Sequence, residues 1–137
     1  MPDQPQSPLP VPERSPGTRI ILLVEDDPAL AEIHRWTLAK AGFEVLQAAD
    51  GMTALALARE RRPDLILSDV MLPKMDGFKL CRLLKFDTDL KRIPFLFLTG
   101  KSQEKDRETG LGAGADAYSV KPISAADLLA LIRKHLP

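Results

Sequence analysis

Five polar residues close short apolar runs at four separate points of the chain: Glu25, Asp26, Asp69, Thr99 and Lys121. If those runs are parallel strands of one sheet, their carboxyl ends meet at one edge, where open α/β sheets bind ligands. Three carboxylates at that edge need a cation, because two of them ~4 Å apart repel by about 4 kcal/mol at an effective dielectric of about 20. Mg²⁺ takes hard oxygen ligands and keeps positions for water and phosphate oxygens. These residue types therefore indicate a magnesium and phosphoryl site.

Each residue has a chemical part in such a site. A carboxylate can attack phosphorus and form an aspartyl phosphate, and Asp69 is the candidate nucleophile. The transition state of phosphoryl transfer carries negative charge on its equatorial oxygens and is stabilised by positioned cations and donors. Lys121 supplies the cation and Thr99 the hydroxyl donor, while Glu25 and Asp26 are ligands for the metal.

The elements that must position these residues follow from an alternation of apolar runs and helical patterns. Asp27 before Pro28 marks the start of a helix, and Gly42 marks its end. Five strand–helix units imply a parallel sheet covered by helices on both faces. We predict an α/β, flavodoxin-like, doubly wound (βα)5 three-layer sandwich with strand order 2-1-3-4-5. Strands are predicted at 19–24, 44–48, 64–69, 93–98 and 116–120, and helices at 28–41, 52–61, 77–86, 103–111 and 125–135.

The composition narrows the class of protein. The chain has 137 residues, which is enough for one domain with a core. Its 19 basic residues balance its 19 acidic residues, and this argues against direct nucleic-acid binding. The one cysteine forms no internal disulfide and fits a reducing cytoplasm. No apolar run reaches the ~20 residues that span a bilayer, so no membrane association is expected.

Residues 1–17 are predicted to be a flexible, Pro-rich tail that precedes the domain at 18–137. Six of the 12 prolines lie among the first 16 residues, a composition that favours extended conformations and builds no core. A role of residues 8–12 in recognition by a proline-binding partner is an alternative to a purely solvated extension.

From Thr18 to Pro137 the chain resembles the receiver domain of a two-component response regulator, of the stand-alone, chemotaxis-regulator-like kind. The resemblance rests on four segments that occur in the right order, namely ILLVEDD at 21–27, DLILSDVMLPKMDG at 64–77, IPFLFLTG at 93–100 and GADAYSVKP at 114–122.

The resemblance implies a role for each matching position. Asp69 would accept a phosphoryl group from a phosphohistidine. The metal, Mg²⁺ with Mn²⁺ as the alternative, would be held by Glu25, Asp26, Asp69 and the backbone carbonyl of Met71.

The same resemblance implies a conformational switch. Thr99 and Lys121 would hold the phosphoryl group. Thr99 would turn toward its oxygens, and Tyr118 would move inward to fill the space that Thr99 leaves. The peptide bond between Lys121 and Pro122 would be cis.

The function predicted from these residues is a cytoplasmic, phosphorylation-activated switch of a two-component or phosphorelay system. The donor would be a histidine kinase or a histidine phosphotransferase. The protein would act on a downstream protein through its fourth helix, fifth strand and fifth helix. Because the chain ends at Pro137, directly after the last helix, we expect no output domain and no direct contact with nucleic acid. The protein would assist its own phosphorylation and dephosphorylation without being a dedicated enzyme.

Two other functions use related chemistry or the same fold. An aspartyl-phosphate phosphohydrolase needs a general acid near the nucleophile, usually two residues on, where this chain has Met71. A flavodoxin-like cofactor-binding protein needs hydroxyl and glycine phosphate loops, whereas the first strand here is followed by Glu25-Asp26-Asp27.

The first helix leaves one question open. Trp36 lies well off the predicted inner face of this helix. That face is marked by Leu30, Ile33, Thr37 and Ala41. Trp36 would either anchor a partner or pack against the edge of a neighbouring helix. His34 and His135 have no acidic or cysteine partner nearby in sequence, so surface or helix-face roles are favoured over metal binding.

Overall fold

The computed structural model describes residues 17–137, so the predicted tail at 1–17 lies outside the described residues apart from Gly17. The sequence boundary between tail and domain stays a prediction. Five strands and five helices alternate along the described chain, in the order β1 Ile20–Val24, α1 Pro28–Lys40, β2 Glu44–Ala48, α2 Gly51–Arg61, β3 Leu65–Ser68, α3 Gly77–Phe86, β4 Phe95–Thr99, α4 Glu104–Gly112, β5 Ala117–Val120 and α5 Ala125–His135. Each predicted element is present, with ends that differ by at most two residues.

The five strands form one parallel sheet in the order β2-β1-β3-β4-β5, which confirms the predicted topology. β1, β3 and β4 lie in the interior of the sheet, and every residue of these three strands is buried. Their continuous apolar sequences suit this position, because a central parallel strand is covered on both faces.

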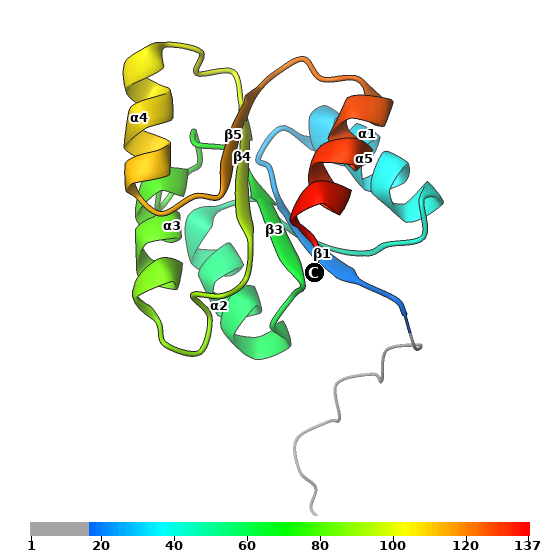
Figure 1. Ribbon diagram of the computed structural model, residues 1–137, viewed down its shortest axis with the longest axis horizontal. Helices are drawn as coiled ribbons and strands as arrows, with labels where there is room; N and C mark the ends of the chain where they lie inside the picture. Colours follow the sequence, from blue (N-terminus) through cyan, green and yellow to red (C-terminus); the bar gives the residue numbers. More distant parts are fainter. Residues whose placement is uncertain (1–16) are drawn as a thin grey trace, which may run out of the picture.

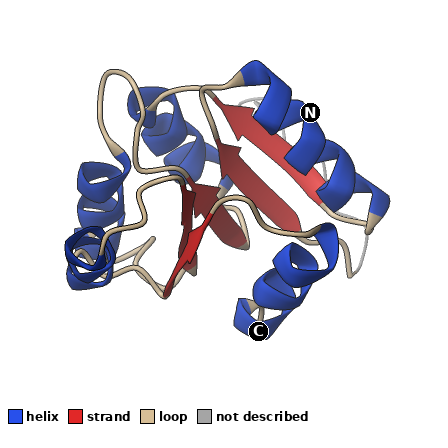
Figure 2. Ribbon diagram, turned by 90° about the horizontal axis from the view of Figure 1, so that it is seen from above, coloured by secondary structure: helices blue, strands red, loops and turns tan. Residues whose placement is uncertain are grey.

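Helices cover the sheet in two layers. α1 and α5 lie on one face, and α2, α3 and α4 lie on the other (Figure 1). The view from above shows the strands between these helices (Figure 2). Alternate residues of the same strand therefore enter different cores, so that Leu22 and Val24 pack on the side of α2 and α3. Ile21 and Leu23 pack on the side of α1 and α5.

Helix starts are set by short polar side chains. Asp27 Oδ1 accepts a hydrogen bond from the Ala29 amide at 2.9 Å, and Pro28 occupies the first helical position. Asp50, Asp76 and Ser124 cap α2, α3 and α5 in the same way. These caps lie at the carboxyl edge of the sheet, where the loops begin, and they fix the helix positions around that edge.

The predicted apolar face of α1 is wrong. The helix buries His34 and Leu38, whereas 58% of Ile33 is exposed. Trp36, which was predicted to lie off the apolar face, is 56% exposed and agrees with that prediction. The side chain of Trp36 lines a groove between α1 and α5, and the Lys40 ammonium lies 4.5 Å from its ring centroid. A residue pattern of one helix does not define its rotation, because the neighbouring strands and α5 determine which side is covered.

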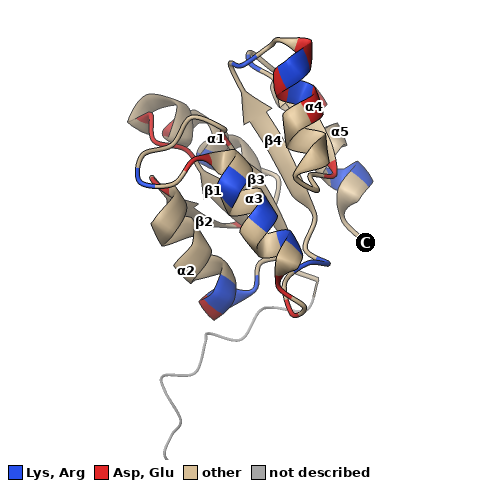
Figure 3. Cartoon of the chain, turned by 90° about the vertical axis from the view of Figure 1, so that its left-hand side faces the viewer, with Lys and Arg blue, Asp and Glu red and all other residues tan. Residues whose placement is uncertain are grey.

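Basic residues recur along α3, whereas α4 carries both acidic and basic residues (Figure 3). Within the described part of the chain, no helix has the length and apolar character needed to cross a bilayer.

Candidate functional site

The sheet register brings the predicted site residues to one edge. Val24 lies opposite Ser68, so the residues that follow them, Glu25 and Asp69, leave neighbouring strands at the same level. The amide of Asp69 donates to the Val24 carbonyl at 3.0 Å. On the other side of the sheet, the amide of Lys121 donates to the Thr99 carbonyl at 2.8 Å. Four separate chain segments therefore converge, as their positions after apolar runs predict.

Lys121 joins the segments through its ammonium group. Lys121 Nζ lies 2.6 Å from Glu25 Oε1 and 2.8 Å from Asp69 Oδ2. The two carboxylates come from points 96 and 52 residues away in sequence. Burial disfavours the charged ammonium, but the hydrogen bonds that it donates to Asp69 and Glu25, together with their negative charges, outweigh that cost and raise the pKa of Lys121. The lysine is therefore a fixed positive charge between two acids.

Asp69 is held on both oxygens. Its Oδ1 accepts hydrogen bonds from the backbone amides of Val70 at 2.6 Å and Met71 at 3.2 Å. Its Oδ2 faces Lys121, and only 8% of the residue is exposed. Donors on both oxygens fix the orientation of the carboxylate. This arrangement suits a nucleophile that must be aligned with its target.

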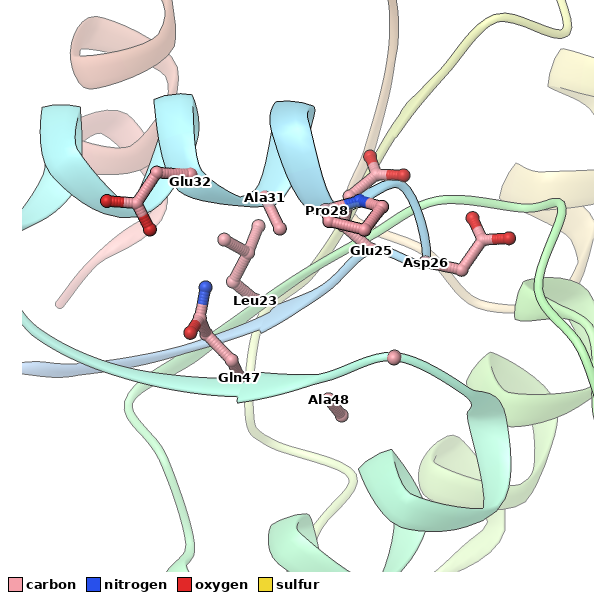
Figure 4. A pocket seen from close by; sticks show the side chains of 9 residues that line it. Leu23, Glu25, Asp26, Pro28, Ala31, Glu32, Gln47 and Ala48 are labelled. Carbon is pink, nitrogen blue, oxygen red and sulfur yellow. The ribbon is translucent and has the colours of Figure 1, made fainter.

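A divalent cation fits the acid cluster. Glu25, Asp26 and Asp69 each offer one oxygen, and these three atoms lie within 4.8 Å of one another. Three carboxylates and one ammonium leave two negative charges unmatched, and a divalent cation would neutralise them. Asp26 is exposed, so the cluster is open to solvent. A groove between α1 and β2 runs beside Glu25 and Asp26 (Figure 4).

Thr99 and Tyr118 are linked through the loop after β4. Thr99 is fully buried, and its Oγ1 accepts a hydrogen bond from the Lys101 amide at 3.3 Å. The Tyr118 hydroxyl donates to the Lys101 carbonyl at 2.7 Å, and 7% of Tyr118 is exposed. Burial raises the pKa of the phenol, and the charges of Asp106 and Asp69 add to this effect. The two predicted switch residues therefore contact the same peptide segment.

Two glycines shape the acceptor loop, and the sequence interpretation did not single them out. A Cβ atom on Gly77 would lie 2.2 Å from the Asp69 carbonyl oxygen, and one on Gly51 would lie 2.1 Å from the Met75 carbonyl oxygen. The amide of Gly77 also donates to the Val70 carbonyl at 2.8 Å. Each follows an Asp that caps its helix, and this Asp-Gly pairing was the available signal. The close approach itself depends on long-range packing.

Met71 contacts Asp69 through its backbone, whereas its side chain points away into solvent. Its amide binds Asp69, which places its backbone beside the acceptor, but its side chain is 60% exposed. The role of its carbonyl as a metal ligand stays a prediction.

The peptide bond between Lys121 and Pro122 is cis, as the resemblance implies.

His34 lies behind the site, on the buried face of α1 and not on the surface, so of the two predicted roles the helix-face one applies. It is 9% exposed and lines a cavity with Leu30, Lys121 and Pro122. Burial lowers the pKa of the imidazole, the charge of Lys121 lowers it further, and Glu25 opposes both. The spacing of His34 and Leu38, four residues apart on one helix, was the signal that both share the buried side.

This burial predicts a pH dependence of stability. Because the folded-state pKa of His34 lies below the ordinary 6.5, the unfolded chain binds the proton first, and stability falls as the pH drops below 6.5. His34→Gln should reduce that loss, which urea unfolding at a series of pH values would measure. His135→Gln is the matched control. Equal pH dependence of the wild type and both variants would contradict the assignment.

Comparison with known proteins gives one family. The family described as "Response regulator receiver domain" matches residues 21–133. Among curated proteins, the "DNA-binding dual master transcriptional regulator RpaA" of Synechocystis is 43% identical over 116 residues, which are 85% of this chain and 48% of that protein. The "DNA-binding response regulator MtrA" of Mycolicibacterium smegmatis is also 43% identical, over 85% of this chain and 50% of its own length. The chain thus spans about half the length of these relatives.

Solved structures agree with this result. The chemotaxis response regulator CheY4 of Vibrio cholerae has a TM-score of 0.82 and 34% identity, over 87% of this chain and 99% of that chain. The receiver domain of sensor histidine kinase PA1611 from Pseudomonas aeruginosa has a TM-score of 0.81 and 34% identity, over 86% of this chain and 97% of that chain. The latter structure holds a magnesium ion in its active site cleft.

The relatives overturn one prediction about partners. The expectation of no direct contact with nucleic acid is wrong, since similar regulators are described as DNA-binding. The balance of acidic and basic residues describes only the present 137 residues. It gives no information on segments that relatives of twice the length contain. For the same reason, the expectation of a stand-alone protein stays a prediction.

Proposed function

Because this chain belongs to the response regulator receiver domain family, we propose that Asp69 is the acceptor of its phosphorylation-activated switch. The observation that carries the proposal is the Lys121 ammonium, which lies between Asp69 and Glu25 at the edge where Thr99 also ends its strand. Among the described residues, Asp69 is the carboxylate that receives both this cation and two backbone amides.

Transfer begins with attack on phosphorus. An oxygen of Asp69 forms a bond to the phosphorus of a phosphohistidine, the bond from phosphorus to the imidazole nitrogen breaks, and the leaving imidazole takes up a proton. The amides of Val70 and Met71 hold the carboxylate in place during this step. Fixed orientation of the nucleophile removes much of the entropy cost of bringing the reactants together.

Lys121 and Thr99 act on the transferred group. Lys121 Nζ, now 2.8 Å from Asp69 Oδ2, lies where it can pair with a phosphoryl oxygen while it keeps its contact with Glu25. The Thr99 hydroxyl accepts a hydrogen bond from the Lys101 amide, so its own proton remains for donation to the phosphoryl group. Positioned donors of this kind commonly contribute the largest part of the stabilisation of phosphoryl charge.

A divalent ion would be held by Glu25, Asp26 and Asp69, with Mg²⁺ as the preferred ion and Mn²⁺ as the alternative. When bound, it would neutralise charge that develops on the phosphoryl oxygens. The donor set supports this assignment, because all ligands are oxygens and Mg²⁺ prefers such ligands. The magnesium ion of the PA1611 receiver domain gives further support.

Membership of the family supports a proposal for the cellular setting. We place the protein in the cytoplasm, where a histidine kinase or histidine phosphotransferase would supply the phosphoryl group. It would assist its own phosphorylation and dephosphorylation and would not turn over a separate substrate. The names of RpaA and MtrA support a DNA-binding activity as the controlled output.

The alternative functions gain no support. A phosphohydrolase would need a general acid two residues after Asp69, and the thioether of Met71 donates no proton. A flavodoxin-like cofactor site would have to bind phosphate beside Glu25 and Asp26, whose charges repel it. The comparisons show receiver domains for the described fold.

A phosphorylation assay tests the proposal. Incubation of the protein with acetyl phosphate and Mg²⁺ should add one phosphoryl group, as measured by intact mass. Chelation of the metal should reduce the rate by at least about a hundredfold, because the acid cluster then repels the incoming phosphate. The addition of salt to the same ionic strength without Mg²⁺ is the control. No mass gain with Mg²⁺ would refute the proposed function.

A further inference from the structure

Gly110 of α4 faces the ring of Tyr118 across a gap that admits no side chain. A Cβ atom built on Gly110 would lie 2.7 Å from Tyr118 Cδ2, 3.0 Å from Tyr118 Cε2 and 3.2 Å from Phe97 Cδ2. The ring of Tyr118 in turn packs on Phe97, with 5.7 Å between the ring centroids. We call this buried arrangement, with the hydroxyl on the Lys101 carbonyl, the inward position of Tyr118.

The backbones on either side of this gap are fixed. Phe97 of β4 and Tyr118 of β5 are paired residues of the sheet. Arg107, three residues before Gly110, donates from Nη1 to the Tyr118 carbonyl at 3.4 Å and ties α4 to β5. A larger residue at 110 would therefore displace the Tyr118 ring, which can rotate about its side-chain bonds, more readily than it would displace α4.

In its inward position, Tyr118 is connected to the edge of the sheet that carries Asp69 and Thr99. The Tyr118 hydroxyl donates to the Lys101 carbonyl at 2.7 Å, and the amide of Lys101 donates to Thr99 Oγ1 at 3.3 Å. One residue, Lys101, thus binds the tyrosine with its carbonyl and the threonine with its amide. A displaced Tyr118 ring would lose the hydrogen bond on one side of this segment and would change the surface between α4 and β5.

We infer that Gly110 is a positioning residue of the switch: its missing side chain provides the space in which the Tyr118 ring lies inward. This inference rests on the proposed function in one respect, the link from Thr99 to a phosphoryl group on Asp69. Gly110 sets the population of the inward position, because any side chain at 110 occupies the volume of the ring.

Two alanine substitutions in the same helix test this inference. Alanine normally stabilises a helix interior relative to glycine, so this local effect favours Gly110→Ala, and it is smaller at Gly112, the last residue of α4. At Gly112, two residues further along α4, a Cβ atom would meet nothing within 4 Å, which makes Gly112→Ala the matched control for Gly110→Ala. The chain contains one tyrosine, so incorporation of 3-fluorotyrosine gives a single ¹⁹F signal that reports on Tyr118.

Gly110→Ala should move the ¹⁹F signal toward the value of the urea-unfolded protein and lower the inward population about tenfold. Gly112→Ala should superimpose on the wild type. After incubation with acetyl phosphate and Mg²⁺, wild type should keep the inward signal and Gly110→Ala should remain displaced. A Gly110→Ala signal equal to that of Gly112→Ala would overturn the inference.

A stability measurement covers the case in which Gly110→Ala folds poorly. The Tyr118→Ala background removes the ring, so Gly110→Ala should no longer lower the urea midpoint there. An equal loss in both backgrounds would refute the contact as the cause. The proposed function would fail if neither wild type nor Gly112→Ala gained phosphoryl mass. In that case the ¹⁹F comparison without a phosphodonor would still decide the role of Gly110.

Discussion

Asp69→Asn is expected to abolish the gain of a phosphoryl group, with a fall in rate of more than about 10⁴-fold, the scale seen when a nucleophile is removed. The amide carries no negative charge and attacks phosphorus poorly. It also weakens the contact with Lys121, which now lies 2.8 Å from Asp69 Oδ2. Intact mass after incubation with acetyl phosphate and Mg²⁺ measures the effect.

The matched control is Asp89→Asn, because Asp89 is an exposed acid in the connection between α3 and β4. It should gain phosphoryl mass at the wild-type rate. Phosphorylation of Asp69→Asn at an appreciable rate would mean that another group is the acceptor. Peptide mapping of the modified protein would then locate that group.

Lys121→Met is expected to slow phosphorylation by about 10² to 10³-fold, because the transferred group loses a positioned cation. It should also lower the free energy of unfolding by about 3 kcal/mol, the lower end for a broken buried ion pair. The lower end applies because 17% of the Lys121 side chain is exposed, although Glu25 and Asp69 are 4% and 9% exposed. Two buried carboxylates would remain without their cation.

Urea unfolding with and without Mg²⁺ measures the stability effect. Mg²⁺ should stabilise Lys121→Met more than wild type, since the variant has one more unmatched negative charge at the acid cluster. Lys79→Met, which changes an exposed lysine of α3, is the control for loss of charge alone. If Lys121→Met and Lys79→Met unfolded at the same urea concentration, the ion pairs would contribute nothing to stability.

The same ion pairs predict a loss of stability in alkali. The folded-state pKa of Lys121 lies above its ordinary 10.5, so the folded protein holds this proton more tightly than the unfolded chain. The contribution is complete below pH 10.5 and is lost as the pH rises through the folded-state pKa. Lys121→Met should lack this part of the pH dependence.

Local signals in the sequence predicted the elements and the strand ends correctly. The apolar run from Ile20 to Val24 is a buried strand, and Asp27 with Pro28 starts the next helix. Gly42 ends that helix region with a φ of 101°, a conformation that favours glycine. Such signals are readable because they depend on residues within a few positions of one another.

The rotation of α1 was not readable in the same way. His34 is buried and Ile33 is exposed, the reverse of the expected pattern. A helix presents whichever side the sheet and α5 cover, and the burial of an imidazole beside Lys121 is the outcome of that packing. Hydrophobicity alone favours Ile33 for the interior, so the tertiary contacts overrode it.

By itself, the sequence determined the order of the elements, the position of each polar residue after its strand and the family to which these residues point. The tertiary structure decided which atoms meet: Lys121 with carboxylates 96 and 52 residues away, and Gly110 with the ring of Tyr118. The physical reason is the distance in sequence over which each interaction acts. Caps and strand patterns act between neighbours in sequence, whereas ion pairs and close approaches depend on strand order, register and helix rotation, which are properties of the whole packed chain.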